Sequence, residues 1–269
     1  MSDRYAVIGQ PISHSRSPQI HSQFAIQTAQ SLSYEAIEIA ADALKSRLAE
    51  LHAQGYAGLN VTLPHKITVI ALCEEVSDRA RLAGAVNTLI RTASGWLGDN
   101  TDGEGFICDL QRLGIAVNGR RVLVLGAGGA VRGILEPLLR AKPAELVVSN
   151  RNPWKPETLA EDFASVGKLL PRTHLSLKGD QYDLIINATS AGHAGQMITL
   201  PPDLLAAGCD CYDLSYGKAF APFADWAKTQ KAARVEDGLG MLVGQAAAAF
   251  ALWRGVAPQT APVIAALRS

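Results

Sequence analysis

The sequence predicts an α/β protein made of two domains, and three observations support this class. Residues 122–125 are an apolar run that leads directly into the glycine-rich segment 126–130, and a second apolar run follows at residues 146–150. The first hundred residues alternate strand-like with helix-like stretches, as chains that form mainly parallel sheets with both faces covered do. A chain of 269 residues is also long enough to bury two separate cores.

Hydrophobic periodicity gives the order of elements in the first hundred residues. Apolar runs predict strands at residues 5–9, 34–39, 58–62 and 87–90. Helical spacing of apolar residues predicts helices at residues 19–29, 43–54 and 77–83. Residues 95–98, which begin and end with glycine, suggest a hairpin.

A second α/β stretch follows from about Gly103. We expect a helix at residues 130–140 and strands at 121–125, 146–150, near Leu175, 183–188 and 211–214. A long alanine-rich helix is predicted at residues 242–253, and a short helix begins at Ala261. These terminal helices are expected to pack back on the first domain, which makes that domain discontinuous.

The predicted boundaries divide the chain by function. Residues 1–102 together with 238–269 would form a substrate-binding and catalytic domain with an open, mainly parallel sheet. Residues 103–237 would form a Rossmann-like dinucleotide-binding domain, with a cleft between the two.

The glycine segment indicates which cofactor is bound. In dinucleotide-binding folds the glycines let the backbone approach a pyrophosphate, whose charge lies at the N-terminus of the next helix. Gly126 and Gly128 fit this pattern, although Val131 stands at the third glycine's place. The second strand ends in Asn150 and Arg151, where an NAD enzyme would have an acid. Because a guanidinium can clamp a 2′-phosphate, the sequence predicts NADP.

Four polar clusters follow predicted strands, at residues 13–18, 60–66, 98–103 and 213–218. Each also has a plain structural explanation. Ser17 could be the N-cap of a helix whose first residue is Pro18, and the acids of residues 98–103 could form a turn. Lys66 is unusual, because a lysine in the first turn of a helix opposes the helix dipole. Lys66 and Asp102 are the pair that we nominate for proton transfer to a carbonyl that accepts a hydride.

Bulk composition excludes several classes of protein. The formal net charge is zero, so no nucleic-acid partner is expected. The four cysteines are scattered and predict neither disulfides nor a metal site. The N-terminus lacks the apolar segment of a signal peptide, and no apolar run is long enough for a membrane span. We therefore expect a cytoplasmic enzyme for a small molecule, and leave a homodimer open.

The motifs, taken together, resemble the shikimate dehydrogenase family, whose members reduce 3-dehydroshikimate to shikimate with NADPH on the route to aromatic amino acids. The resemblance covers nearly the whole chain in the family's order. The matching segments are residues 13–18 (SHSRSP), 60–66 (NVTLPHK), 83–88 (AGAVNT), 98–103 (GDNTDG), 126–130 (GAGGA), 150–151 (NR), 187–190 (NATS) and 237–242 (DGLGML).

The resemblance implies a role for each matching residue. Lys66 and Asp102 would be the catalytic pair, with Lys66 handling the proton at the C3 oxygen. The residues implied around the substrate are Ser15, Ser17, Thr62, Asn87, Asp102, Tyr216 and Gln245. Those implied around NADP are Asp78, Gly126, Ala127, Gly128, Gly129, Ala130, Asn150, Arg151, Lys155, Thr189, Leu214, Gly238 and Met241.

Four residues depart from the family pattern, and two other functions stay open. Asn152 and Pro153 replace a threonine-containing segment, Leu214 replaces a frequent methionine, and Glu104 stands where an apolar residue is common. One alternative is a quinate/shikimate dehydrogenase of broader substrate and cofactor use. The other is an NADP-binding module without activity, although Lys66 and Asp102 both stand in their motifs.

Overall fold

The computed structural model describes residues 2–268, which divide into two compact units. The first unit contains residues 2–106 and 242–268, and the second contains residues 107–241. The chain passes between the units inside two helices, α4 (Asp102–Leu113) and α8 (Leu239–Arg254). The first unit is therefore discontinuous in sequence.

The first unit is built on a mixed six-stranded sheet with the strand order β2-β1-β3-β5-β6-β4. Its strands are β1 (Asp3–Gly9), β2 (Leu32–Glu38), β3 (Tyr56–Val61), β4 (Glu75–Val76), β5 (Thr88–Arg91) and β6 (Trp96–Asp99). β1 pairs in parallel with β2 and β3, whereas β5 runs antiparallel to β3 and β6. The carboxyl ends of β1, β3 and β6 consequently meet at one edge, together with the start of β5.

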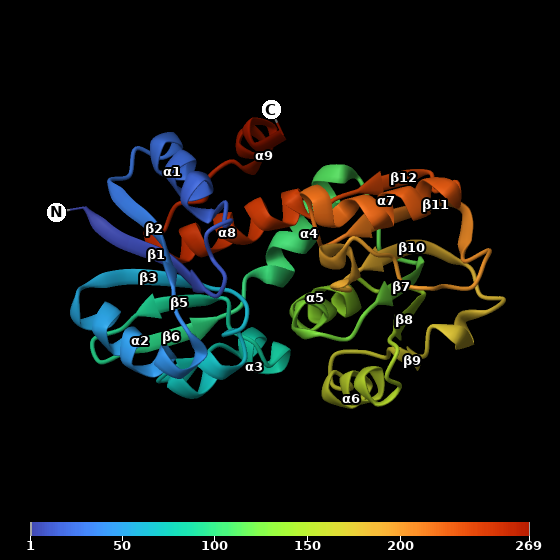
Figure 1. The fold of residues 1–269 in the computed structure, drawn as a ribbon, viewed down its shortest axis with the longest axis horizontal. Helices are drawn as coiled ribbons and strands as arrows, with labels where there is room; N and C mark the ends of the chain where they lie inside the picture. Colours follow the sequence, from blue (N-terminus) through green and yellow to red (C-terminus); the bar gives the residue numbers. More distant parts are fainter. Residues whose placement is uncertain (1, 269) are drawn as a thin grey trace. The chain divides into compact units, whose positions relative to one another are not determined.

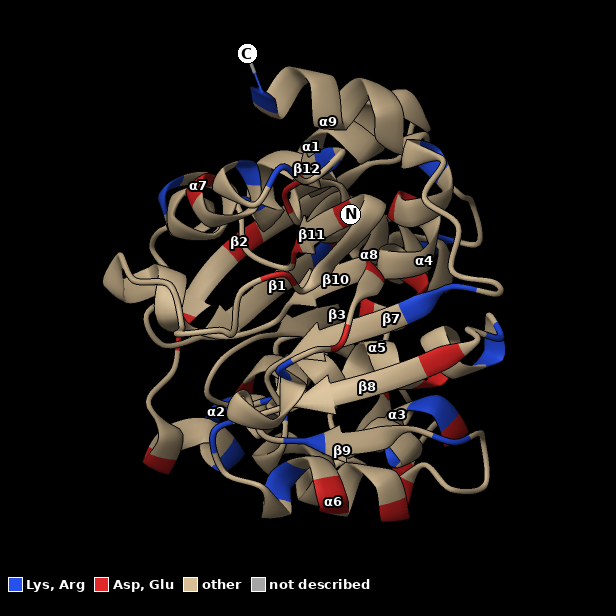
Figure 2. Cartoon of the chain, turned by 90° about the vertical axis from the view of Figure 1, so that its right-hand side faces the viewer, with Lys and Arg blue, Asp and Glu red and all other residues tan. Residues whose placement is uncertain are grey.

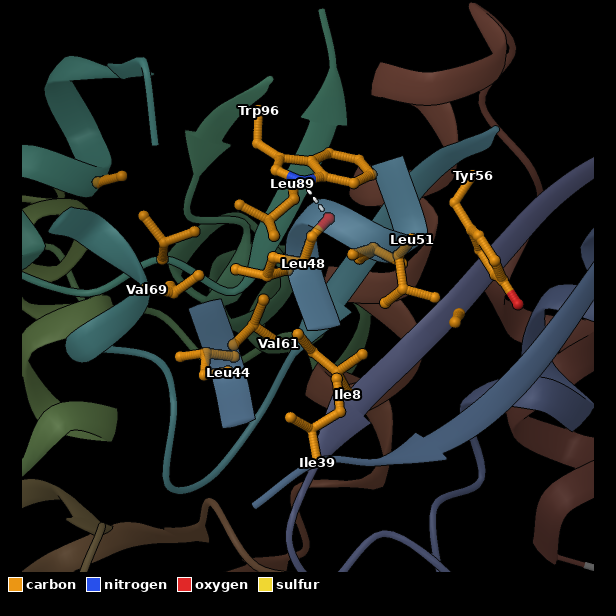
Figure 3. Packing of buried hydrophobic residues seen from close by; sticks show 14 residues of the cluster. Ile8, Ile39, Leu44, Leu48, Leu51, Tyr56, Val61, Val69, Leu89 and Trp96 are labelled. Carbon is orange, nitrogen blue, oxygen red and sulfur yellow. Dashed lines mark hydrogen bonds between the residues drawn. The ribbon is translucent and has the colours of Figure 1, made fainter. Parts of the chain in front are cut away.

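Helices cover this sheet on both faces. They are α1 (Ser17–Gln27), α2 (Leu44–Ala53), α3 (Asp78–Ala83), the C-terminal part of α8, and α9 (Thr260–Arg268). Figure 3 shows leucines of α2 pointing toward Ile8 and Val61 of the sheet. Burying such side chains contributes about 1.5–3 kcal/mol each. On α1 and α8, His21, Phe24 and Phe250 form an aromatic cluster.

The C-terminal helices pack closely within the first unit. In Figure 1, α9 lies beside α1, and the Arg16 guanidinium donates a hydrogen bond to the Leu267 carbonyl at 2.9 Å. A Cβ on Gly58 of β3 would lie 2.3 Å from Nε1 of Trp253, so only glycine lets α8 approach that strand.

The second unit contains a six-stranded, fully parallel sheet with the order β12-β11-β10-β7-β8-β9. Its strands are β7 (Arg121–Leu125), β8 (Glu145–Ser149), β9 (Leu170–Arg172), β10 (Tyr182–Asn187), β11 (Leu205–Asp213) and β12 (Arg234–Glu236). Its helices are α5 (Gly129–Arg140), α6 (Trp154–Asp162) and α7 (Ala221–Thr229), besides most of α4. Figure 2 shows charged residues along α6 and α7, while the middle of β8 is uncharged. That pattern is typical of strands buried between helix layers.

The structure confirms the two α/β domains and most predicted elements, but it corrects three details. Leu175 is not in a strand: β9 ends at Arg172, and Leu175 begins the short 3₁₀ helix η3 (Leu175–Leu177). The hairpin suggested by residues 95–98 is present as β5 and β6, but its turn lies between the two strands, from Thr92 to Gly95: the Thr92 amide donates to the Gly95 carbonyl, and β6 begins at Trp96. β4 and β12 are too short to show periodicity. Among the described residues, no helix is long and apolar enough to cross a membrane.

Candidate functional site

Lys66 and Asp102 form a hydrogen-bonded ion pair at the edge of the first sheet. The Lys66 Nζ lies 2.6 Å from Oδ2 of Asp102. The Asp102 side chain is 7% exposed and that of Lys66 is 22% exposed, so the lysine is accessible while the carboxylate is enclosed. A short, charge-assisted bond of this kind fixes the position of the ammonium group.

The helix predicted to begin at Lys66 is absent. Lys66 instead lies in a turn, and the first regular element that follows is the 3₁₀ helix η2 (Thr68–Leu72). Lys66 therefore does not oppose a helix dipole, contrary to the prediction. Its position is explained by Asp102, which draws the side chain toward the end of β6.

Asp102 is itself held on its other oxygen and on its backbone. Its Oδ1 accepts a hydrogen bond from the Asn87 Nδ2 at 2.8 Å. Its amide donates to the Asn100 side-chain oxygen at 3.0 Å, which starts α4 at this residue. Because both carboxylate oxygens have donors, Asp102 cannot rotate without losing a bond.

Asn87 is the centre of a buried polar network. Its Oδ1 accepts from the Thr101 amide at 2.8 Å and from the Thr88 hydroxyl at 2.9 Å. Its Nδ2 also lies 3.3 Å from Oε1 of Gln245, which comes from α8. The structure thus brings together four predicted site residues: Lys66, Asn87, Asp102 and Gln245.

Three further predicted residues belong to the same edge of the sheet. Ser15 and Ser17 follow β1, and the Ser15 hydroxyl accepts from the Ser17 amide at 3.3 Å. Thr62 follows β3, and a Cβ on Gly9 would lie 2.5 Å from its methyl group, so the ends of β1 and β3 are in close contact. Ser17 does not cap α1 as its structural explanation required, because it is already the first helical residue and Arg16 stands at the cap.

Arg79 explains Glu104, which departs from the family pattern. Two nitrogens of the Arg79 guanidinium each lie 2.7 Å from an oxygen of Asp99, and a third lies 2.9 Å from Glu104. Burial raises the pKa of Asp99, but Arg79 and Ser77 outweigh it, so the pKa is lowered overall. Asp78 is exposed at the start of α3, and its place near a cofactor stays a prediction.

In the second unit, the glycine segment has an open backbone. Gly126 has a φ of +108°, and a Cβ there would lie 2.9 Å from the Ala188 carbonyl oxygen, so glycine is required. Gly128 caps α5, and a Cβ on Gly128 or Gly129 would meet nothing within 4 Å. Val131 is fully buried in the core, which explains the missing third glycine. A helix N-terminus that begins with such uncrowded glycines fits a pyrophosphate.

Cations gather where β8 ends. Asn150 is anchored by its amide to the Arg172 carbonyl at 3.1 Å, and Arg151 beside it is exposed. The Lys155 Nζ lies 5.5 Å from the centre of the Trp154 ring. Burial and then the charge of Arg151 lower the pKa of His174. These groups fit a phosphate monoester better than a bare ribose hydroxyl.

The remaining predicted residues follow β10 and β11 or lie near the start of α8, in the second unit. They are Thr189, Leu214, Tyr216, Gly238 and Met241. Sequence reasoning missed Asp213 as an organising residue, because only the pairing of β10 with β11 places it beside Asn187.

Comparisons with known proteins agree with this geometry. Family models described as the shikimate dehydrogenase substrate binding domain, shikimate / quinate 5-dehydrogenase and shikimate 5′-dehydrogenase C-terminal domain match residues 7–89, 110–198 and 238–268. A shikimate dehydrogenase (NADP(+)) of Alkalilimnicola ehrlichii is 50% identical over 100% of this chain and 99% of the relative.

Two solved structures have a similar fold over nearly the whole chain. An Ael1 enzyme from Pseudomonas putida has a TM-score of 0.93 at 43% identity, with 99% of this chain and 98% of that chain covered. Shikimate 5-dehydrogenase from Thermus thermophilus, in complex with NADP(H) and shikimate, has a TM-score of 0.86 at 34% identity over the same shares.

Proposed function

The chain belongs to the shikimate dehydrogenase family, and on that premise we propose that it reduces 3-dehydroshikimate to shikimate with NADPH, reversibly. The observation that carries the proposal is the Lys66–Asp102 pair, held at 2.6 Å inside the network of Asn87. A protein that only bound the nucleotide would have no use for a fixed, accessible ammonium group at a strand edge.

The substrate is a small acid with several hydroxyls, which needs many short donors and acceptors. Ser15, Ser17 and Thr62 supply hydroxyls after β1 and β3. Asn87 and Gln245 supply amides beside Asp102. We assign these side chains, with Tyr216, to the carboxylate and hydroxyls of the substrate.

Lys66 handles the proton. During reduction the carbonyl oxygen at C3 gains negative charge, and an ammonium group within hydrogen-bond reach can give it a proton. Asp102 keeps the ammonium in place and accepts from its neighbours throughout. In the oxidative direction the same nitrogen takes the proton back from the C3 hydroxyl. NADPH, when bound, supplies the hydride.

The second unit has the residues to hold NADPH. The open backbone of Gly128 and Gly129 would bind the pyrophosphate at the N-terminus of α5. Arg151 and Lys155 would bind the 2′-phosphate. Asn152 and Pro153 shape this turn, since the Asn152 carbonyl accepts from the Asn150 side chain at 3.2 Å.

The main alternative is a quinate/shikimate dehydrogenase that also uses NAD. The exposed Arg151 argues against it, because a guanidinium at the end of β8 gains nothing from a ribose without phosphate. Initial rates with shikimate and quinate, each with NADP and NAD, separate the two. Activity confined to shikimate with NADP supports the proposal, whereas comparable efficiency with quinate and NAD would refute it.

We also propose the cytoplasm as the compartment and aromatic amino acid biosynthesis as the pathway. The test is restoration of growth without aromatic amino acids in a cell that lacks this reductase. A homodimer can be tested separately by sedimentation equilibrium.

A further inference from the structure

Asp213 is a fully buried carboxylate that the mechanism above does not use. It is the last residue of β11, and its two carboxylate oxygens accept hydrogen bonds from different segments. Oδ2 accepts from the Asn187 Nδ2 at 2.8 Å, and Oδ1 accepts from the Ser215 amide at 2.8 Å. Burial raises its pKa to about 6, although the hydrogen bonds from the Ser215 amide, Asn187 and the Ser215 side chain, and the charge of His193, oppose this.

Asn187 passes the effect of Asp213 to the next segment. Because its Nδ2 is committed to Asp213, its Oδ1 faces Thr189 and accepts from the Thr189 amide at 3.2 Å and hydroxyl at 2.8 Å. The orientation of the Asn187 amide group is thus decided by the carboxylate. An amide turned the other way would present its NH₂ to the Thr189 amide.

The segment after Asp213 is tied to two others. The Leu214 amide donates to the Asn187 carbonyl at 2.9 Å, and the Gly238 amide donates to the Ser215 carbonyl at 2.9 Å. A Cβ on Gly238 would lie 2.2 Å from the Leu214 carbonyl oxygen. Thr189, Leu214 and Gly238, all assigned above to the cofactor, therefore depend on one pair of side chains.

We propose that Asp213 is a positioning residue for cofactor binding: through Asn187 and Ser215 it sets the loops after β10 and β11 that carry Thr189 and Leu214. This inference rests on the proposed function, and on the family resemblance that implies a place for those two residues around NADP. A carboxylate is needed because two donors converge on one short side chain. An asparagine there would accept one donor and turn its own NH₂ toward the other.

The experiment compares NADPH affinity in three proteins, measured by fluorescence titration without substrate. Asp213→Asn should raise the Kd for NADPH about tenfold, the loss expected when a hydrogen bond to a charged group is removed. The KM for shikimate should rise less than the Kd for NADPH, because the network holds Thr189 directly and reaches the substrate residue Tyr216 only as the neighbour of Ser215. The double variant Asn187→Asp/Asp213→Asn exchanges the two side chains. It allows every donor to find an acceptor again, and should restore the affinity to within about threefold of wild type.

Each outcome decides the matter. A folded Asp213→Asn variant that binds NADPH as wild type does, even with a lower Tm, would overturn the proposal. If Asp213→Asn does not fold, the double variant decides alone: wild-type affinity supports the role, and a folded protein with weak binding refutes it. Failure of the proposed function would look different, as wild type would bind NADPH without reducing 3-dehydroshikimate.

Discussion

Asp102 holds Lys66 with one carboxylate oxygen, at 2.6 Å, while its other oxygen is held by a buried amide. The lysine therefore has a fixed partner that itself cannot turn. Positioning of this kind removes much of the entropic cost of bringing an acid to a reacting oxygen. The pair comes from two strand ends 36 residues apart in sequence, so its geometry depends on the sheet and not on local chain preferences.

Arg151 should determine the preference for NADP. Arg151→Ala is expected to raise the KM for NADP by about 10- to 100-fold, the loss of one or two bonds to a phosphate, and to leave the KM for NAD within about twofold. Arg140→Ala is the matched control. Arg140 is the last residue of α5, at the end away from the glycine segment, and within the described contacts it pairs only with Glu136. Equal weakening of NADP and NAD would show that Arg151 does not read the 2′-phosphate.

Arg79 pairs with both Asp99 and Glu104. Removing Arg79 should lower the free energy of unfolding much more than removing Glu104. Arg79→Met leaves the Asp99 carboxylate, 7% exposed, without its guanidinium, which should cost about 3 kcal/mol in the free energy of unfolding. Glu104→Gln should cost less than about 1 kcal/mol, because Glu104 is half exposed. Urea unfolding at pH 7 compares them.

The same pair predicts a pH dependence. Because the folded pKa of Asp99 is lowered, its contribution is present above the unfolded carboxyl pKa and is lost as the pH falls through the folded value. Wild type and Arg79→Met should therefore converge in stability at acid pH. Equal costs for Arg79→Met and Glu104→Gln at pH 7 would contradict this account.

The pH dependence due to Asp213 should have the opposite sign to that of Asp99. Ionisation of the buried Asp213 should make the folded protein less stable near neutral pH than at acid pH. Its folded pKa of about 6 lies above the ordinary 3.8, so its contribution is full below about pH 4 and is lost as the pH rises through 6. The shift corresponds to about 3 kcal/mol. The stability of wild type relative to Asp213→Asn should fall by about that amount between pH 4 and pH 8 in urea unfolding. A constant difference would mean that Asp213 does not titrate in this range.

Gly105 should be required for the position of Gln245. A Cβ on Gly105 would lie 2.3 Å from the Gln245 amide nitrogen, which is backbone and cannot swing away. Gly105→Ala should cost about 1–3 kcal/mol and raise the KM for shikimate as α8 shifts. The control is Gln111→Ala, at an exposed position of α4, the helix that also contains Gly105. An unchanged KM would place Gln245 outside the substrate site.

Much of the site was predictable because parallel sheets collect strand ends at one edge. Lys66 and Asp102 follow β3 and β6, so their motifs predicted the pair before any distance was known. The NADP assignment followed in the same way from Arg151 at the end of β8.

What the sequence could not predict depends on contacts between distant segments. Lys66 looked like the start of a helix because no local signal shows that Asp102 orders the turn. Glu104 had no explanation until α3 placed Arg79 beside it. Asp213 seemed an ordinary strand end, since only the register of β10 against β11 aligns it with Asn187.

The most direct test of the central claim is a single-turnover measurement on Lys66→Ala, in which NADPH absorbance is followed after mixing with 3-dehydroshikimate. The rate of hydride transfer should fall by about 100-fold or more, the usual contribution of a positioned acid. The Kd for NADPH should stay within about twofold, and Lys45→Ala, on the exposed side of α2, should behave as wild type. A Lys66→Ala variant that turns over at the wild-type rate but binds NADPH weakly would contradict the account.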